Sequence, residues 1–233
     1  MSLELGPGIT FGPGVRIDPV TPEVVTSGLQ LYLKANTYSG TGTTWTDSSV
    51  NAYATTLVGA PTWNTDYFTF DGSTQYDDVG QSLAFETFSI GAWFRTTSSG
   101  YQMLISKETI AGGPWNYRLY LGGGDIISDI AAGGSTAISA SGSYNDGGWY
   151  YIMATYDATN WYLYANGVEI ATASSGISGP ITSSQSVWIG RSYYLGGNYQ
   201  FTGDFGQAFI YDRALTAGEV LQNYNATRGR FGL

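Results

Sequence analysis

Two glycine-flanked segments of this chain carry aromatic rings beside amide or guanidinium donors, which are the residue types that bind sugars. Aromatic faces cover the C–H surface of a sugar ring, and polar groups on loops bind its hydroxyls. The predicted glycan-binding residues are Trp115, Asn116 and Tyr117 in segment 112–118, and Arg191, Tyr193, Tyr194, Asn198 and Tyr199 in segment 191–199. The alternative is that these rings cover an edge of the domain or a subunit interface, where Tyr, Trp and Arg are equally enriched.

Glycoside hydrolysis is the reaction that a sugar site would most readily support, and it needs two carboxyl groups about 5 to 10 Å apart. On a strand, residues i and i+2 or i+4 place such groups on one face. The six glutamates are scattered over separate segments, at positions 4, 23, 86, 108, 169 and 219. Asp77 and Asp78 are adjacent and would face opposite sides, whereas Asp125 and Asp129 lie next to the turn-forming Gly122-Gly123-Gly124. The sequence therefore predicts a protein that is not an enzyme.

Calcium is the metal that the oxygen-rich side chains of this sequence could hold, and no other cofactor is expected. Candidate ligands are Asp47, Asp71, Asp77, Asp78, Asp125, Asp157 and Asp204. We single out Asp71 as the predicted calcium ligand. The alternative for Asp71 is a turn without an ion, because Asp-Gly after Phe-Thr-Phe is ordinary turn chemistry.

The composition excludes several classes of function. There is no cysteine and no histidine, which rules out disulfides, Ser-His-Asp triads and Cys-His catalysis. The net charge of −9 repels phosphate backbones, so no nucleic-acid partner is expected. No apolar run approaches the roughly 20 residues of a membrane span, so no membrane partner is expected. Residues 1–5 lack the basic start and apolar core of a signal peptide, so ordinary export is not expected either.

The elements that must position these residues are short strands. Runs of β-branched and aromatic residues alternate with turn residues from Gly28 onward, as in two-sheet sandwiches and jelly rolls. Asn166-Gly167 between two such runs predicts a hairpin. The alternation of side chains along residues 88–95 predicts a strand with one apolar face. Residues 149–156 predict a strand that is apolar on both faces. Thr216 with Glu219 forms a capping-box pattern that predicts one C-terminal helix.

Residues 1–26 differ from the rest, because a six-residue Gly-Pro-Gly unit occurs twice and is followed by two further prolines. Such a segment cannot bury enough surface to form a core of its own. We therefore predict two parts, an extended N-terminal arm over residues 1–26 and one domain over residues 27–233. A neighbouring subunit is the expected partner of the arm; the alternatives are packing on the arm's own domain and a flexible leader.

Taken together, the segments resemble the laminin-G-like, concanavalin A-like lectin/glucanase superfamily. The resemblance is carried in order and spacing by 28–33, 45–49, 68–73, 88–94, 153–157, 163–167, 188–191, and 211–216 with Glu219. It implies an all-β fold, a two-sheet antiparallel jelly-roll sandwich, to which the sequence adds one short C-terminal helix and an extended N-terminal arm. Family members include sugar-binding modules, adhesion domains and glycosidases, so the fold alone does not decide the function. The glucanases of the superfamily carry a Glu-x-Asp-x-Glu strand, which is absent from this sequence.

A looser resemblance links the paired Gly-Pro-Gly units and the ends 223–226 and 230–233 to structural proteins of bacteriophages and marine viruses. It implies a non-enzymatic virion protein, assembled in the host cytoplasm with copies of itself or other virion subunits. The alternative is a carbohydrate-binding module of a cell-surface or secreted protein, with a cell-surface glycan as partner. A glycoside hydrolase is the third and least favoured hypothesis.

Overall fold

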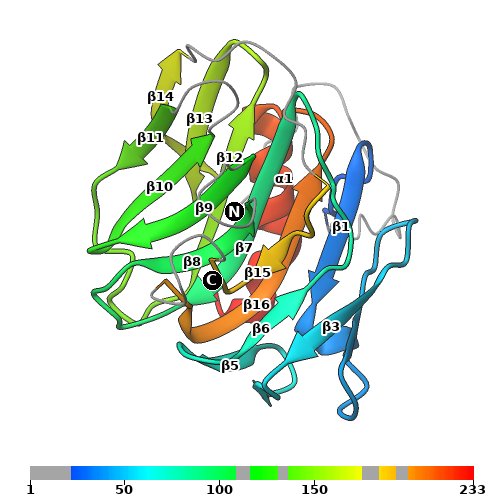
Figure 1. Cartoon of the computed structure of the whole chain (residues 1–233). Helices are drawn as coiled ribbons and strands as arrows, with labels where there is room; N and C mark the ends of the chain where they lie inside the picture. The colour runs from blue at the N-terminus through cyan, green and yellow to red at the C-terminus, as the bar shows by residue number, and fades with distance from the viewer. Residues whose placement is uncertain (1–21, 109–115, 131–135, 175–183, 193–198) are drawn as a thin grey trace, which may run out of the picture.

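The computed structural model describes residues 22–108, 116–130, 136–174, 184–192 and 199–233. The strands within these ranges form two antiparallel sheets that stack on each other (Figure 1). Sheet A runs in the order β14 (Val168–Ser174), β13 (Asn160–Ala165), β12 (Tyr150–Tyr156), β7 (Phe88–Arg95), β16 (Thr202–Tyr211), β5 (Phe68–Asp71), β4 (Thr62–Trp63), with β1 (Leu29–Lys34) also paired to β16. Sheet B runs in the order β11 (Thr136–Ala140), β10 (Asp125–Ile130), β9 (Tyr117–Gly122), β8 (Gln102–Lys107), β15 (Trp188–Ile189), β6 (Tyr76–Asp78), β3 (Ala54–Val58), β2 (Thr44–Thr46).

The main hydrophobic core lies between the two sheets. Phe88, Ile90 and Phe94 of β7 are fully buried in it, as their alternation predicts. Leu119 of β9 and Ile105 of β8 enter the same core from sheet B. Each such side chain contributes about 1.5–3 kcal/mol on full burial. The core is therefore the main source of stability that holds the two sheets together, and the predicted all-β sandwich is confirmed.

A second core lies on the outer face of sheet A, under helix α1 (Ala217–Thr227) and the short 3-10 helix η2 (Arg228–Phe231). The Trp93 ring stacks on Phe231 with centroids 4.4 Å apart, and its indole N–H donates to the Thr227 hydroxyl at 2.8 Å. Tyr151 and Met153 of β12 are buried here, which confirms that this strand is apolar on both faces. Figure 1 shows α1 behind the strands of sheet A. No helix among the described residues packs on the outer face of sheet B.

Local signals set the boundaries of these elements. The β13–β14 hairpin turns at Asn166 and Gly167, with φ of 50° and 81°, which confirms the predicted hairpin. Helix α1 starts at the predicted capping box, in which the Glu219 N–H donates to the Thr216 hydroxyl at 3.3 Å. The Thr216 N–H in turn donates to the Glu219 carboxylate at 2.9 Å. Within the described ranges no helix is long and apolar enough to cross a membrane.

The predicted arm lies mostly outside the described residues, since residues 1–21 are among those left undescribed. Its last part packs on the domain. The Val25 N–H donates to the Asn223 side-chain oxygen at 2.8 Å, and the Tyr211 hydroxyl donates to the Val25 carbonyl at 3.0 Å. The boundary between residues 26 and 27, and the arm's contact with a neighbouring subunit, stay predictions.

Candidate functional site

The outer face of sheet B presents a row of polar and aromatic side chains. Along β9, Tyr117, Leu119 and Leu121 point into the core, so Arg118 and Tyr120 point outward. Neighbouring β8 begins beside Tyr101, whose ring is half exposed. These elements form a small cavity of about 140 Å³, which we call the tyrosine pocket; it is lined by Tyr101, Met103, Arg118, Tyr120 and Tyr199.

Three tyrosine rings define the shape of the tyrosine pocket. The Tyr101 ring meets Tyr199 edge-on, with centroids 4.9 Å apart, and lies 6.2 Å from Tyr120. Gly122 at the end of β9 makes room for this arrangement, because a Cβ there would come within 3.0 Å of the Tyr101 ring. The buried Met103 also lines the cavity. Rings at several orientations around one cavity can contact the C–H faces of a sugar while their hydroxyl groups bind its polar edge.

A buried group of charges supports the wall of the tyrosine pocket, and we call it the Arg118 cluster: Arg118, Glu108, Asp129, Tyr120 and Ser192. The Arg118 guanidinium makes a two-pronged contact with Asp129, in which Nε donates at 2.7 Å and Nη2 donates to the second oxygen. Nη1 lies 3.4 Å from Glu108, to which the Ser192 hydroxyl also donates. The Tyr120 hydroxyl donates to Asp129 at 3.2 Å. These bonds fix the positions of Arg118 and Tyr120.

Burial and ion pairing act in opposite directions on the charged groups of the Arg118 cluster. Burial by itself lowers the pKa of Arg118, but the hydrogen bond to Asp129 and the charges of Asp129 and Glu108 outweigh burial and raise the pKa of Arg118 above its usual value. Burial is the largest influence on Asp129 and raises the pKa of its carboxyl group, while the hydrogen bonds from Arg118 and Tyr120 and the charge of Arg118 oppose that rise. The cluster holds the Arg118 and Tyr120 side chains in fixed orientations at the pocket wall.

The sequence did not indicate this pairing of acids. Glu108 follows β8 and Asp129 lies on β10, and each is close to Arg118 only because β9 pairs with both strands. Asp129 is the direct cross-strand partner of Arg118. One signal in the sequence could have located Arg118. With Leu119 and Leu121 in the core, strand alternation requires Arg118 and Tyr120 to face the other way.

Of the predicted glycan-binding residues, Tyr199 and Arg191 lie on or near this sheet face. Tyr199 lines the tyrosine pocket. The Arg191 guanidinium lies over the rings of Tyr76 and Trp188, at 4.4 and 5.1 Å, which places it beside strands β6 and β15 rather than in the pocket. Trp115, Tyr193, Tyr194 and Asn198 lie outside the described residues.

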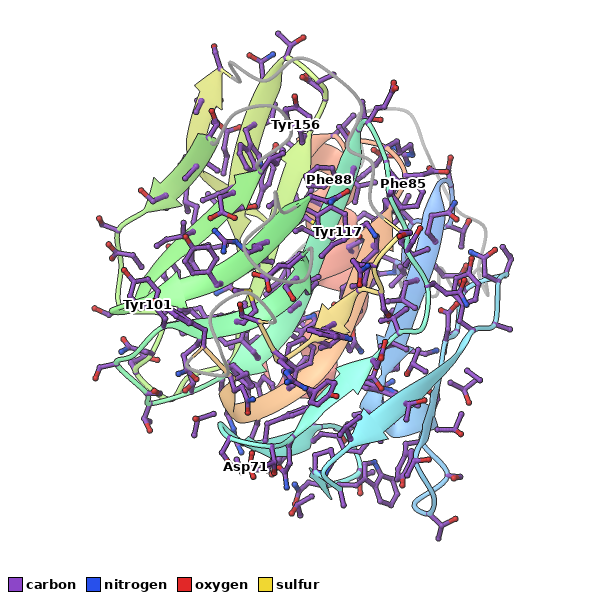
Figure 2. The ribbon with its side chains drawn as sticks, in the orientation of Figure 1. Asp71, Phe85, Phe88, Tyr101, Tyr117 and Tyr156 are labelled. Carbon is purple, nitrogen blue, oxygen red and sulfur yellow. The ribbon has the colours of Figure 1, made fainter. Side chains whose placement is uncertain are left out.

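Asn116 and Tyr117 were predicted to contact a glycan, but the structure places both in the interior of the domain. Asn116 is buried, and Tyr117 is fully buried in the core, 5.0 Å from the Phe88 ring, with its hydroxyl donating to the Leu83 carbonyl at 2.9 Å. Figure 2 shows Tyr101 at one side of the molecule, whereas Tyr117 and Phe88 lie near its middle. A ring in this position presents no face to a ligand on the surface. Tyr117 is therefore a core residue, and the outward position on this strand belongs to Arg118.

Asp71, the predicted calcium ligand, ends β5 and organises a turn. Its carboxylate accepts backbone N–H groups from Ser73, Thr74 and Gln75, at 2.8, 3.0 and 3.2 Å. The slight burial of Asp71 opposes ionisation, but these hydrogen bonds outweigh it and lower the pKa of Asp71 to about 2. The Asp71 carboxylate is thus already hydrogen-bonded to N–H donors of its own turn. Within the residues that the structure describes, no group of three or more acidic side chains gathers at one point. Calcium binding at Asp71 stays a prediction.

The two stacked antiparallel sheets make this chain a β-sandwich protein. A family model described as the concanavalin A-like lectin/glucanases superfamily, of the laminin-G type, matches residues 64–221, which is more than half of the chain. The chain belongs to this superfamily.

Individual proteins and solved structures match part of this chain. A segment of 94 residues is 34% identical to human pappalysin-1, and the match covers 38% of this chain but only 6% of pappalysin-1. The receptor-binding domain of the botulinum neurotoxin C/D mosaic serotype superposes with a TM-score of 0.64 and 12% identity, over 86% of this chain and 51% of that one. The CBM40 of the Ruminococcus gnavus IT-sialidase, bound to α2,3-sialyllactose, superposes with a TM-score of 0.59 and 20% identity, over 67% of this chain and 95% of that one. At these identities the two structures share the fold with this chain.

Proposed function

We propose that this chain is a non-catalytic carbohydrate-binding domain that takes a glycan into the tyrosine pocket on the outer face of sheet B. One observation carries the proposal: three tyrosine rings surround a surface cavity next to an arginine that two acids hold in place. The membership of a lectin-containing superfamily and the similarity to a sialyllactose-bound CBM40 support it as well. Such a domain acts at a cell surface or outside the cell, where glycans are displayed.

A glycan array followed by titration calorimetry on the best ligand tests this function. We expect binding that falls at least about tenfold, or about 1.4 kcal/mol, in Tyr101→Ala and Tyr199→Ala. Tyr162→Ala is the matched control, because Tyr162 lies on β13 of sheet A and is not among the residues of the pocket. Binding that survives both pocket substitutions, or an array without any hit, would reject the proposal.

The predicted virion role remains a proposal with support from the sequence alone. The relatives described above are a receptor-binding domain, a carbohydrate-binding module and pappalysin-1, and none of these is a virion protein. A glycan-binding domain can also serve as the adhesive part of a virion, so the two ideas are compatible. Particle association of the full chain, measured by sedimentation of a host lysate, separates a virion component from a secreted module.

A further inference from the structure

A second cavity lies on the opposite side of the sandwich from the tyrosine pocket, against sheet A. Its volume is about 550 Å³, within the roughly 300–1,000 Å³ of small-molecule sites. We call it the helix-side pocket, because the end of α1 and η2 form one wall and strands β1 and β16 form another. Its lining residues are Pro22, Tyr32, Asp66, Gln207, Asn225, Ala226, Thr227, Gly229 and Arg230.

The helix-side pocket contains an amide donor that has no hydrogen-bond acceptor among the described residues. Gln207 on β16 is only 1% exposed, and its side-chain oxygen accepts a weak hydrogen bond from the Tyr32 hydroxyl at 3.4 Å. Among the described residues, nothing accepts a hydrogen bond from its amide nitrogen. The amide nitrogen is not among the buried side-chain atoms that lack a partner, so it is open to the cavity that Gln207 lines. A ligand oxygen within the cavity can therefore accept a hydrogen bond from it.

The helix-side pocket is also locally positive in a chain whose net charge is −9. The Lys34 ammonium lies 5.0 Å from the centre of the Tyr32 ring, which lines the pocket. Burial lowers the pKa of Lys34, and the like charge of Arg230 lowers it further. Arg230 pairs with Asp66 at 2.9 Å, whereas Lys34 has no ion pair within the described ranges. The pocket lining thus carries one cation, Arg230, and one acid, Asp66, and Lys34 lies beside the lining at the Tyr32 ring.

We propose that the helix-side pocket binds a small anionic ligand, whose carboxylate or phosphate group pairs with Lys34 and Arg230 while a neighbouring oxygen accepts from the Gln207 amide. The anion neutralises the repulsion between the two cations, and the amide provides a directed hydrogen bond. The Tyr32 ring, stacked on Phe209 at 4.7 Å, gives the site a rigid side. This site is separate from the tyrosine pocket, because the two pockets share no lining residue.

Two probes distinguish the possible sources of the anion: glucuronate, which carries a carboxylate on a sugar ring, and inorganic phosphate. Glucose serves as the neutral match of glucuronate. Each is titrated into the full-length protein and followed by amide chemical shifts in NMR. We expect saturable shifts in residues around Gln207 and Arg230 for at least one anion, with affinity that weakens as salt increases. Glucuronate alone would identify a sugar acid, and phosphate alone would identify a phosphorylated ligand.

Charge-removing substitutions with a matched control decide whether the effect is specific. Lys34→Gln and Arg230→Gln are expected to weaken anion binding at least about tenfold, while Arg228→Gln leaves it unchanged. Arg228→Gln removes the same charge two positions before Arg230. The Arg228 side chain lies over the Tyr224 ring and does not line the pocket. Tyr101→Ala should also leave anion binding intact, which separates this site from the proposed glycan site. Equal weakening by Arg228→Gln, equal binding of glucose, or absence of shifts with both anions would overturn the proposal.

Discussion

Asp77 is a buried acid that forms no ion pair with any residue the structure describes, and its environment favours the protonated form. The carboxyl group points into the core from β6 and is fully buried. The Thr55 hydroxyl lies 2.8 Å from both the Trp45 carbonyl and Asp77 Oδ1, but it has only one hydrogen to donate. Both contacts are satisfied at once when Thr55 donates to the carbonyl and a protonated Asp77 donates to Thr55. Burial raises the pKa of Asp77 to about 8, in agreement with that geometry.

The raised pKa predicts that stability falls with pH. Between about pH 4 and pH 8 the folded protein keeps the proton on Asp77 and the unfolded chain has lost it, so the free energy of unfolding decreases by up to about 1.4 kcal/mol per pH unit from this group. Asp77→Asn keeps the shape without the titration. Urea unfolding of both proteins at pH 5, 6 and 7 should show a steeper decline for the wild type. Parallel declines would contradict a protonated Asp77.

The Arg118 cluster predicts a large penalty when its cation is removed. Arg118→Met leaves Glu108 and Asp129 buried without their compensating charge, and breaking a buried pair in this way costs about 3–5 kcal/mol. Arg95→Met is the control. Its partner is Asp204, and both side chains are partly exposed, so about 1 kcal/mol or less is expected. Chemical unfolding of the two variants measures the difference, and similar losses would show that the cluster does not depend on Arg118.

At the scale of elements, helix α1 stabilises sheet A without touching the proposed glycan site. Its capping box satisfies N–H groups at the first turn, and Glu219 also pairs with Arg213 through two bonds, at 2.9 and 2.6 Å. Thr216→Ala should therefore lower the free energy of unfolding by about 1 kcal/mol, and Thr216→Ser should restore most of it. Because α1 packs against sheet A, glycan affinity at sheet B should stay the same in both variants. Thermal unfolding measures the change in stability, and calorimetry measures the glycan affinity. A reduced glycan affinity would show that the two sheets are coupled.

The strands were predictable because their signals are local, while the site depends on strand pairing. The Asn166-Gly167 turn and the Thr216–Glu219 capping box act within a few residues, so the sequence alone locates them. Tyr117 was predicted as a glycan contact in a glycine-flanked segment, but its side chain is fully buried in the core. Neighbouring residues of a strand face opposite sides, so the outward position beside Tyr117 belongs to Arg118. The contact between Glu108 and Arg118 could not be foreseen, since it requires the pairing of β8 with β9.

At the scale of the whole molecule, the positions of Asp71 and the tyrosine pocket predict that glycan binding does not require calcium. Asp71 ends β5 of sheet A, whereas the pocket is formed on β8 and β9 of sheet B, and Figure 2 shows Asp71 at the lower edge, away from Tyr101. The Asp71 carboxylate already accepts three backbone N–H groups that hold its turn. Calorimetry with the array ligand should give the same affinity in EDTA and in roughly 2 mM calcium. At that concentration, calcium would occupy sites with the dissociation constants of about 10⁻⁴–10⁻³ M that are typical of extracellular modules. A change of more than about threefold that Asp71→Asn abolishes would instead assign a calcium ion to Asp71 and connect that turn to the glycan site.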